Sequence, residues 1–224
     1  MSAVTHELRT PLTTFTLYSQ MLADGMITEE SARHEYYKTL RNEAQRLSRI
    51  VESVLDYAHL GTRSGGVKVT PIPAQELVER VVPLLKTRAC DGGMELIVES
   101  GDLQGVTVNA DHNSVERILL NLIDNANKYA QTASDRRVHL TVEADTRSLS
   151  LVLADHGPGI SPDERDRIFS PFQRGKAQSS GNTPGMGLGL AFARTLAQDL
   201  GGDLKLVKKE NFGAAFELRL KITD

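Results

Sequence analysis

Two runs of small and apolar residues at heptad spacing, both within residues 1–60, constrain the fold of this chain more than any other feature. The second run has such residues at alternating steps of three and four: Tyr37, Leu40, Ala44, Leu47, Val51, Val54 and Ala58. The first run has the same spacing at Val4, Leu8, Pro11, Phe15, Tyr18 and Leu22. This spacing places the side chains on one face of an α-helix. We therefore expect two amphipathic helices that are interrupted at Asp24-Gly25.

Two helices joined by a short connection form an antiparallel hairpin. A hairpin alone leaves much of so long an apolar seam in contact with water. Pairing with a second copy of the chain covers the seam in a four-helix bundle, so the sequence predicts a homodimer.

Beyond the glycine-rich residues 61–66, which are typical of a linker, the pattern changes to short alternating runs and further helices. Strands are expected at residues 94–99, 106–109, 138–144, 149–154, 204–207 and 214–222, and helices at 74–88, 113–129 and 187–200. The alternation indicates strands with one buried and one wet face, so we expect helices to cover one face of the sheet. The expected fold class is α+β. It consists of a helical hairpin forming a dimeric four-helix bundle in residues 1–62, a linker at 63–66, and an α/β sandwich with a mixed sheet in 67–224.

Some local features carry expectations of their own. Pro83 predicts a kink or a break in the helix at residues 74–88. The helix at residues 113–129 is expected to begin with Asn113 or Ser114 as its N-cap, with Glu116 placed for a capping box. Residues 174–185 are rich in Gly, Ser, Asn and Pro, which predicts a mobile loop.

Composition narrows the function classes. The formal net charge of −3 lacks the Lys and Arg excess of nucleic-acid-binding domains, so no nucleic-acid partner is expected. The single cysteine, Cys90, excludes an intrachain disulfide. No apolar run approaches the roughly 18–20 residues that span a bilayer. We expect a cytoplasmic chain with no membrane contact of its own, which is compatible with a sensory or membrane region upstream.

His6 lies on the helix face opposite the first apolar run, about 200° from Val4 when each residue advances by about 100°. Thr10 lies one turn further along the same exposed face. An exposed neutral imidazole is a nucleophile, and the adjacent Glu7 can hold one ring N–H so that the other nitrogen attacks. Taken alone, an incidental His-Glu pair on a solvated helix face is the simpler interpretation.

Asn121, Asn125 and Lys128 share one face of the helix at residues 113–129. Amide oxygens are ligands for Mg²⁺, and a lysine supplies positive charge to phosphate. The opposite face is apolar, with Leu119, Leu122, Ile123 and Ala126. A plain polar outer face therefore remains open as an alternative.

Two glycine-rich segments come after expected strand and loop positions. Asp-His-Gly-Pro-Gly-Ile at residues 155–160 follows a strand directly; its glycines permit close backbone approach to a ligand. Asp155 can accept a hydrogen bond from an exocyclic amine such as that of adenine. Gly-Met-Gly-Leu-Gly-Leu at residues 185–190 precedes a helix, where free N–H groups bind phosphates. Alone, the first segment equally fits a strand-to-helix turn, and the second is a weak glycine triplet.

Together these motifs resemble those of sensor histidine kinases. Thr-His-Glu-Leu-Arg-Thr-Pro-Leu at residues 5–12 resembles their phosphoacceptor box, residues 121–129 the N box, and residues 155–160 the first glycine box. Ile-Phe-Ser-Pro-Phe-Gln-Arg at residues 168–174 resembles their phenylalanine box, and residues 185–190 the second glycine box. The boxes follow the family order and cover almost the whole chain. The resemblance implies a dimerisation and histidine phosphotransfer hairpin followed by a Bergerat-type ATP-binding catalytic domain.

The resemblance also implies an activity and site residues. It implies an ATP-dependent protein histidine kinase of a two-component system that autophosphorylates on His6. The phosphoryl group would pass to an aspartate of a response-regulator receiver domain, and the kinase would also dephosphorylate that regulator. Glu7 would be the adjacent acid or base, Thr10 would position water for the phosphatase reaction, and Asn125 would bind Mg²⁺. Asp155 would recognise the adenine of ATP. The further nucleotide-binding residues are Asn121, Lys128, Tyr129, Gly157, Gly159, Ile160, Phe169, Arg174, Gly185, Gly187, Leu188 and Gly189.

Two residues depart from the family pattern. Gln173 stands where an aromatic residue is frequent, and His156 lies within the first glycine box. Two other classes of protein differ from this pattern. An ATPase clamp of the gyrase, Hsp90 or MutL kind would have a carboxylate in place of Asn121 and no phosphoacceptor hairpin. A signalling scaffold without activity would have lost a residue of these boxes, and none is missing.

Overall fold

Two helices form the N-terminal part of the chain in the computed structural model. The structure describes residues 3–60, 68–173 and 187–223, but not the side chains of residues 3, 4, 6, 7, 49 and 52–60. Helix α1 spans Ala3–Ala23 and helix α2 spans Glu30–Leu60. The two helices pack against each other, and the rings of Tyr18 and Tyr36 stack with 4.4 Å between centroids. Gly25 has a φ of 67°, which lets the chain turn where α1 ends. The prediction of two helices interrupted at Asp24-Gly25 is confirmed.

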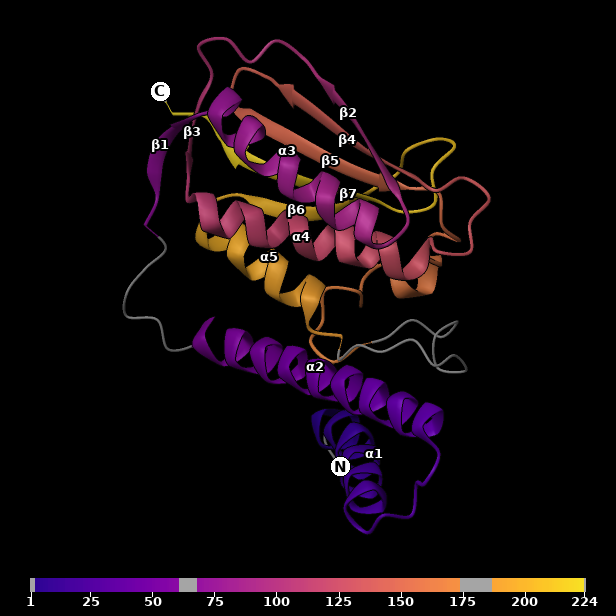
Figure 1. Cartoon of the computed structure of the whole chain (residues 1–224). Helices are drawn as coiled ribbons and strands as arrows, with labels where there is room; N and C mark the ends of the chain where they lie inside the picture. Colours follow the sequence, from indigo (N-terminus) through magenta and orange to yellow (C-terminus); the bar gives the residue numbers. More distant parts are fainter. Residues whose placement is uncertain (1–2, 61–67, 174–186, 224) are drawn as a thin grey trace.

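The second part of the chain is a sheet with helices on one face (Figure 1). Its elements are β1 (Thr70–Pro73), α3 (Ala74–Asp91), β2 (Glu95–Ser100), β3 (Thr107–Ala110), α4 (His112–Tyr129), β4 (Arg137–Ala144), β5 (Ser148–Asp155), a 3-10 turn (Pro162–Glu164), α5 (Gly189–Asp199), β6 (Asp203–Val207) and β7 (Ala215–Lys221). Strands β2, β4, β5, β7 and β6 are neighbours in that order. The β2–β4 pair is parallel and the other three pairs are antiparallel. This mixed sheet confirms the α+β fold class.

The core lies between the sheet and the three helices that cover it. Side chains at most 1% exposed include Leu119, Leu122 and Ile123 from α4, and Leu140, Leu151 and Leu218 from β4, β5 and β7. Full burial of one such side chain stabilises the fold by about 1.5–3 kcal/mol. Because the apolar face of α4 is committed to this core, its polar face is directed away from the sheet.

Helix α4 begins earlier than the sequence predicted. Its N-cap is Asp111, whose carboxylate accepts hydrogen bonds from the backbone N–H (2.8 Å) and the hydroxyl (2.7 Å) of Ser114. The expectation that Asn113 or Ser114 would be the N-cap was wrong. Three neighbouring residues all suit a cap. Strand β3, which ends at Ala110, fixes the choice by bringing Asp111 to the start of the helix.

Prolines lie within one helix and one strand of the second part of the chain. Helix α3 does not break at Pro83, and Val81 and Leu85 on either side of it are fully buried in the core. Strand β1 was not among the expected strands; it contains Pro71 and Pro73, which cannot donate to a ladder. It pairs with one strand only, β3, in a separate two-stranded sheet.

The expected linker at residues 63–66 and the expected mobile loop at 174–185 lie outside the described residues. The domain boundaries at residues 62 and 67 therefore stay predictions. No helix in the described part of the chain combines the length and apolar content required to cross a membrane.

Candidate functional site

The carboxylate of Asp155 lies at the end of β5 and is only 6% exposed. Its Oδ1 accepts hydrogen bonds from the backbone N–H groups of Gly157 (2.8 Å) and Ala214 (3.3 Å). Burial raises the pKa of this carboxyl, while the same two N–H groups act in the opposite direction. No group among the described residues forms a hydrogen bond with Oδ2. One oxygen is therefore fixed by the backbone, and the other is available to an external donor.

Three glycines bring two backbone segments together beside Asp155. Gly159 has a φ of 76°, and a Cβ at this position would lie 2.8 Å from the carbonyl oxygen of Gly213. A Cβ at Gly213 would overlap the carbonyl group of Gly157. The N–H of Gly213 also donates to the carbonyl oxygen of Asp155 at 2.7 Å. The turn at residues 155–159 is thus held against the loop between β6 and β7, and only glycine fits at the contact.

Gly213 was not identified from the sequence. It comes just before β7 in Asn-Phe-Gly, which is a turn signal and nothing more. Gly213 matters because its backbone lies against that of Gly157, which is more than fifty residues away in the chain.

The polar face of α4 presents the predicted amides. The Nδ2 of Asn125 is buried, and no group in the described part of the chain accepts its hydrogen bond. Asn121 donates from Nδ2 to the carbonyl oxygen of Arg117 (2.9 Å), and its Oδ1 would lie 2.9 Å from a Cβ at Gly189. The structure therefore brings the predicted Asn121 next to the predicted Gly189, where α5 begins. The unsatisfied amide of Asn125 thus lies one helical turn from Asn121, which meets the start of α5, and this arrangement is suited to a polar ligand.

The segment before α5 is closed by a backbone contact. The N–H of Phe172 donates to the carbonyl oxygen of Gly187 (3.0 Å), and a Cβ at Gly187 would overlap the carbonyl of Gln173. Gly187 has a φ of 69°, and Phe172, although not a glycine, has a φ of 63°. Residues 173 and 187 therefore lie against each other. The predicted Arg174 and Gly185, between them, are outside the described residues.

The other predicted nucleotide-binding residues have mixed surroundings. Lys128 donates to the hydroxyl of Tyr129 (2.9 Å) at the end of α4. Leu188 is 2% exposed, whereas Ile160 and Phe169 are partly buried and pack against the core.

The phosphoacceptor box lies on a separate element. His6 and Glu7 belong to α1, and Thr10 is exposed on the same helix. The side chains of His6 and Glu7 are not described. Pro11 is buried within α1 and does not break the helix. The hairpin meets the second part of the chain through α2, which contacts α5 (Figure 1).

Two parts of the sequence match models of known protein families. Residues 1–63 match the model of the His Kinase A (phospho-acceptor) domain. Residues 110–224 match the model of the histidine kinase-, DNA gyrase B- and HSP90-like ATPase family.

The curated relatives are sensor kinases. Sensor protein KdpD of Escherichia coli is 28% identical over 98% of this chain and 24% of its own length. Histidine protein kinase DivJ of Caulobacter vibrioides is 29% identical over 99% of this chain and 37% of its own length. The chain thus spans well under half the length of these curated relatives.

Solved structures share the fold. Histidine kinase AdeS of Acinetobacter baumannii superimposes with a TM-score of 0.73 and 23% identity over 98% of both chains. Full-length ShkA in complex with AMPPNP gives a TM-score of 0.66 and 28% identity over 97% of this chain and 44% of ShkA. Histidine kinase ThkA in complex with the response regulator TrrA gives a TM-score of 0.74 and 24% identity over 98% of this chain and 60% of ThkA.

A helical phospho-acceptor domain followed by an ATPase domain of this family is the arrangement of one class of protein kinase. With both family models matched in that order, the chain belongs to the sensor histidine kinases of two-component systems.

The contact of Gly213 with Gly157 leads to a prediction about stability. Gly213→Ala is expected to lower the free energy of unfolding by about 1–3 kcal/mol, because the new methyl group meets a backbone carbonyl that cannot move aside alone. The matched control is Gly101→Ala, where a Cβ would lie 3.6 Å from the nearest atom, the Val142 carbonyl oxygen. Urea unfolding followed by circular dichroism measures both variants. Equal midpoints for the two variants would contradict the prediction.

Proposed function

We propose that the chain is an ATP-dependent protein histidine kinase that autophosphorylates on His6 and passes the phosphoryl group to an aspartate of a response-regulator receiver domain. The observation that carries the proposal is the buried Asp155 carboxylate, with Oδ1 fixed by two backbone N–H groups and Oδ2 open to a donor. This arrangement suits the exocyclic amine of adenine, which needs an acceptor in an otherwise apolar site.

The nucleotide phosphates are proposed to lie along the polar face of α4 and the start of α5. The orphaned amide of Asn125 fits a role at Mg²⁺, because an amide can turn its oxygen to a cation when one is bound. When bound, Mg²⁺ neutralises charge on the phosphate oxygens. Asn121 and Lys128 would add polar and positive contacts to the phosphates. Arg174 would approach the γ-phosphate. The glycines at 185, 187 and 189 would let the phosphates come within hydrogen-bond distance of backbone N–H groups.

In the proposed reaction a ring nitrogen of His6 attacks the γ-phosphorus. The nitrogen–phosphorus bond forms as the bond to the oxygen of ADP breaks, and Glu7 accepts the proton that the ring gives up. Because His6 and Asp155 belong to different parts of the chain, the two parts must approach each other for this step. The glycine-rich residues 61–66 are proposed to permit that movement.

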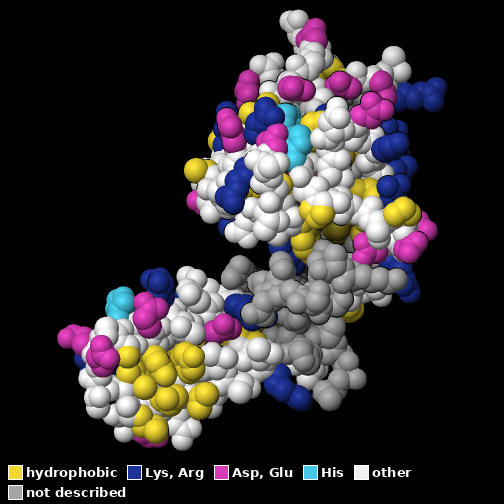
Figure 2. Space-filling model, turned by 90° about the vertical axis from the view of Figure 1, so that its right-hand side faces the viewer, with side chains coloured by type: hydrophobic (Ala, Val, Ile, Leu, Met, Phe, Trp, Pro, Cys, Tyr) yellow, Lys and Arg dark blue, Asp and Glu magenta, His cyan; other side chains and the backbone are white. Residues whose placement is uncertain are grey.

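A homodimer is proposed from the hairpin. Three residues of the predicted seam, Phe15, Tyr37 and Val51, are 36%, 56% and 48% exposed in the single chain. Figure 2 shows hydrophobic side chains gathered on the hairpin. Covering them with a second hairpin is favourable, because each 100 Å² of apolar surface removed from water contributes about 2.5 kcal/mol. The partner would complete a four-helix bundle.

The second proposed partner is a receiver domain, in line with the ThkA–TrrA complex. A docked receiver would present its aspartate to His6 and, after transfer, its aspartyl phosphate to Thr10 one helical turn away. Thr10 would then position water for a phosphatase reaction. For this chemistry we place the chain in the cytoplasmic part of a sensor.

The first prediction concerns the phosphoacceptor. His6→Gln is expected to abolish labelling by γ-labelled ATP while nucleotide binding persists, because His6 lies on α1 and the nucleotide residues lie on the sandwich. His34→Gln, an exposed histidine on α2, is the control and should label normally. The label should be lost in acid and survive base. Loss of ATP affinity in His6→Gln would mean that His6 belongs to the nucleotide site instead.

The second prediction tests the acceptor at the adenine. Asp155→Asn is expected to weaken ATP binding by roughly tenfold to more than a hundredfold, since a lost hydrogen bond to a buried group costs about 1–3 kcal/mol. Asp163→Asn, at an exposed position, serves as control. Isothermal titration calorimetry measures both. An unchanged affinity in Asp155→Asn would remove the assignment of Asp155 to the adenine.

The third prediction separates two activities on one helix face. Thr10→Ala is expected to leave autophosphorylation largely intact and to slow dephosphorylation of the regulator, because a hydroxyl can hold water but cannot neutralise phosphate charge. Mid-helix threonines also bond to their own helix backbone. Both rates are therefore measured on the same preparation. An equal fall in the two rates would point to that structural role and count against the phosphatase assignment.

A further inference from the structure

His156 joins three segments around the candidate nucleotide site. Its ring stacks on that of Phe212, with 4.7 Å between centroids and 28° between planes. Its Nδ1 lies 3.2 Å from the carbonyl oxygen of Asn211, and its Nε2 lies 3.5 Å from Oδ2 of Asp135. Residue 156 thus contacts both the loop between β6 and β7 and the segment between α4 and β4.

The same two segments flank the turn that begins at Asp155. The loop between β6 and β7 supplies the N–H of Ala214 to the Asp155 carboxylate and the N–H of Gly213 to its carbonyl. The segment after α4 begins at Ala130, which lies so close to Gly157 that a Cβ there would be 3.2 Å from the Ala130 methyl group. His156 is therefore placed to keep both walls against the turn that carries the adenine acceptor.

Hydrogen-bond chemistry assigns the protons of the His156 ring. Both neighbours of the ring only accept hydrogen bonds, and the neutral ring carries one proton. The shorter contact, 3.2 Å from Nδ1 to the Asn211 carbonyl oxygen against 3.5 Å from Nε2 to the Asp135 carboxylate, assigns that proton to Nδ1. In the neutral ring Nε2 is then a bare acceptor that faces the Asp135 carboxylate, and it is buried without a hydrogen-bond donor among the described residues. A second proton, on Nε2, turns this facing pair of acceptors into a histidine–aspartate ion pair.

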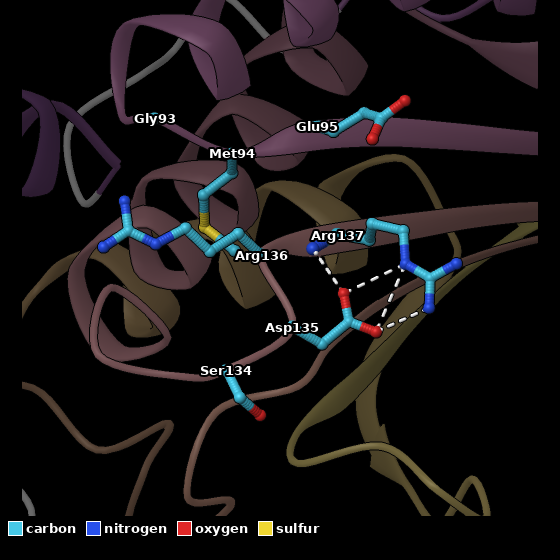
Figure 3. Close-up of a pocket in the computed structure, with 7 residues that line it drawn as sticks. All are labelled: Gly93, Met94, Glu95, Ser134, Asp135, Arg136 and Arg137. Carbon is cyan, nitrogen blue, oxygen red and sulfur yellow. Dashed lines mark hydrogen bonds and ion pairs between the residues drawn. The ribbon is translucent and has the colours of Figure 1, made fainter.

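The carboxylate of Asp135 can accept a hydrogen bond from a protonated Nε2 of His156. Two hydrogen bonds from the Arg137 guanidinium, Nη2 to Oδ2 at 2.6 Å and Nε to Oδ1 at 3.0 Å, fix the carboxylate (Figure 3). These bonds hold the pKa of Asp135 well below its usual range. The carboxylate is therefore charged whenever the His156 ring gains its proton.

Other charged and titratable groups near His156 lie on β4, on the loop between β6 and β7, on β5 and on β2. His139 of β4 meets the His156 ring edge-on at 5.4 Å, and burial lowers its pKa, an effect to which His156 and Arg137 add. Lys209 lies 4.9 Å from the Phe212 ring and donates to Thr141. Asp155 adjoins His156 in the chain, and Glu95 and Glu99 of β2 face Arg137 and His139. His139 thus remains neutral to lower pH than an ordinary histidine.

We propose that His156 is a positioning residue for nucleotide binding, which clamps the segment after α4 and the loop between β6 and β7 onto the Asp155 turn and does so more firmly when its Nε2 is protonated. The clamp orders the two backbone donors of Asp155, so ATP affinity rises as pH falls from about 8 to about 6.5. The positive ring also favours the charged form of Asp155. This inference rests on the proposed role of Asp155 in binding adenine.

The test is the ratio of wild-type affinity to variant affinity for ATP, measured by calorimetry at about pH 8 and about pH 6.5. Taking a ratio at each pH cancels the titration of the ATP phosphates. For His156→Phe, which keeps the stack on Phe212, the ratio is expected to rise about threefold towards the lower pH, as for a partly exposed ion pair. Asp135→Asn should show the same rise because it removes the partner of Nε2. His156→Gln, which can still donate to Asn211, replaces His156→Phe if the latter does not fold.

His112→Gln is the matched control, because His112 of α4 also faces a carboxylate, that of Glu76 on α3, at 3.4 Å. Its ratio to the wild type should not change with pH. A pH-independent ratio for the His156 variants, or for Asp135→Asn, would overturn the clamp while leaving ATP binding in place. If the wild type itself does not bind ATP at either pH, the proposed function fails and the clamp fails with it.

Discussion

The hydrogen bonds that hold the Asp155 carboxylate require two backbone segments of the sandwich to lie in direct contact. A buried charge is costly unless it is hydrogen-bonded, and here two backbone N–H groups from different segments meet that need. For both donors to reach one oxygen, the turn at residues 155–159 and the loop before β7 must touch along their backbones. Glycines at residues 157, 159 and 213 permit this contact, so the acceptor's geometry is set by backbone rather than by flexible side chains.

The sequence predicted those parts of the fold in which one local pattern dominates. Helix α4 has strong apolar periodicity, and its face with Asn121 and Asn125 followed directly from that period. Strands β4 and β7 alternate clearly, and β4, β5 and β7 were all expected close to their observed bounds. Asp155 was recognisable because it ends such a strand and precedes two glycines.

The parts that were missed depend on contacts between distant residues. Gly213 matters because it meets Gly157, and His156 matters because Asp135 and Phe212 lie on either side of it. Neither relation leaves a local signal, because each partner alone is an ordinary turn residue. The N-cap Asp111 was missed for a related reason. Several adjacent polar residues are suitable N-caps, and the position of the end of strand β3 determines which of them begins the helix.

The two parts of the chain meet at a helix that serves both. Helix α5 contacts α2 of the hairpin, and its first residue, Gly189, abuts Asn121 on the proposed phosphate side of α4. A change in the position of the hairpin would therefore act on the helix whose N-terminus borders the proposed phosphate site. Helix α2 also carries exposed residues of the seam, such as Tyr37 and Val51, so the proposed pairing with a second copy would constrain α2 as well. The proposed pairing and the proposed nucleotide site therefore involve two helices, α2 and α5, that contact each other.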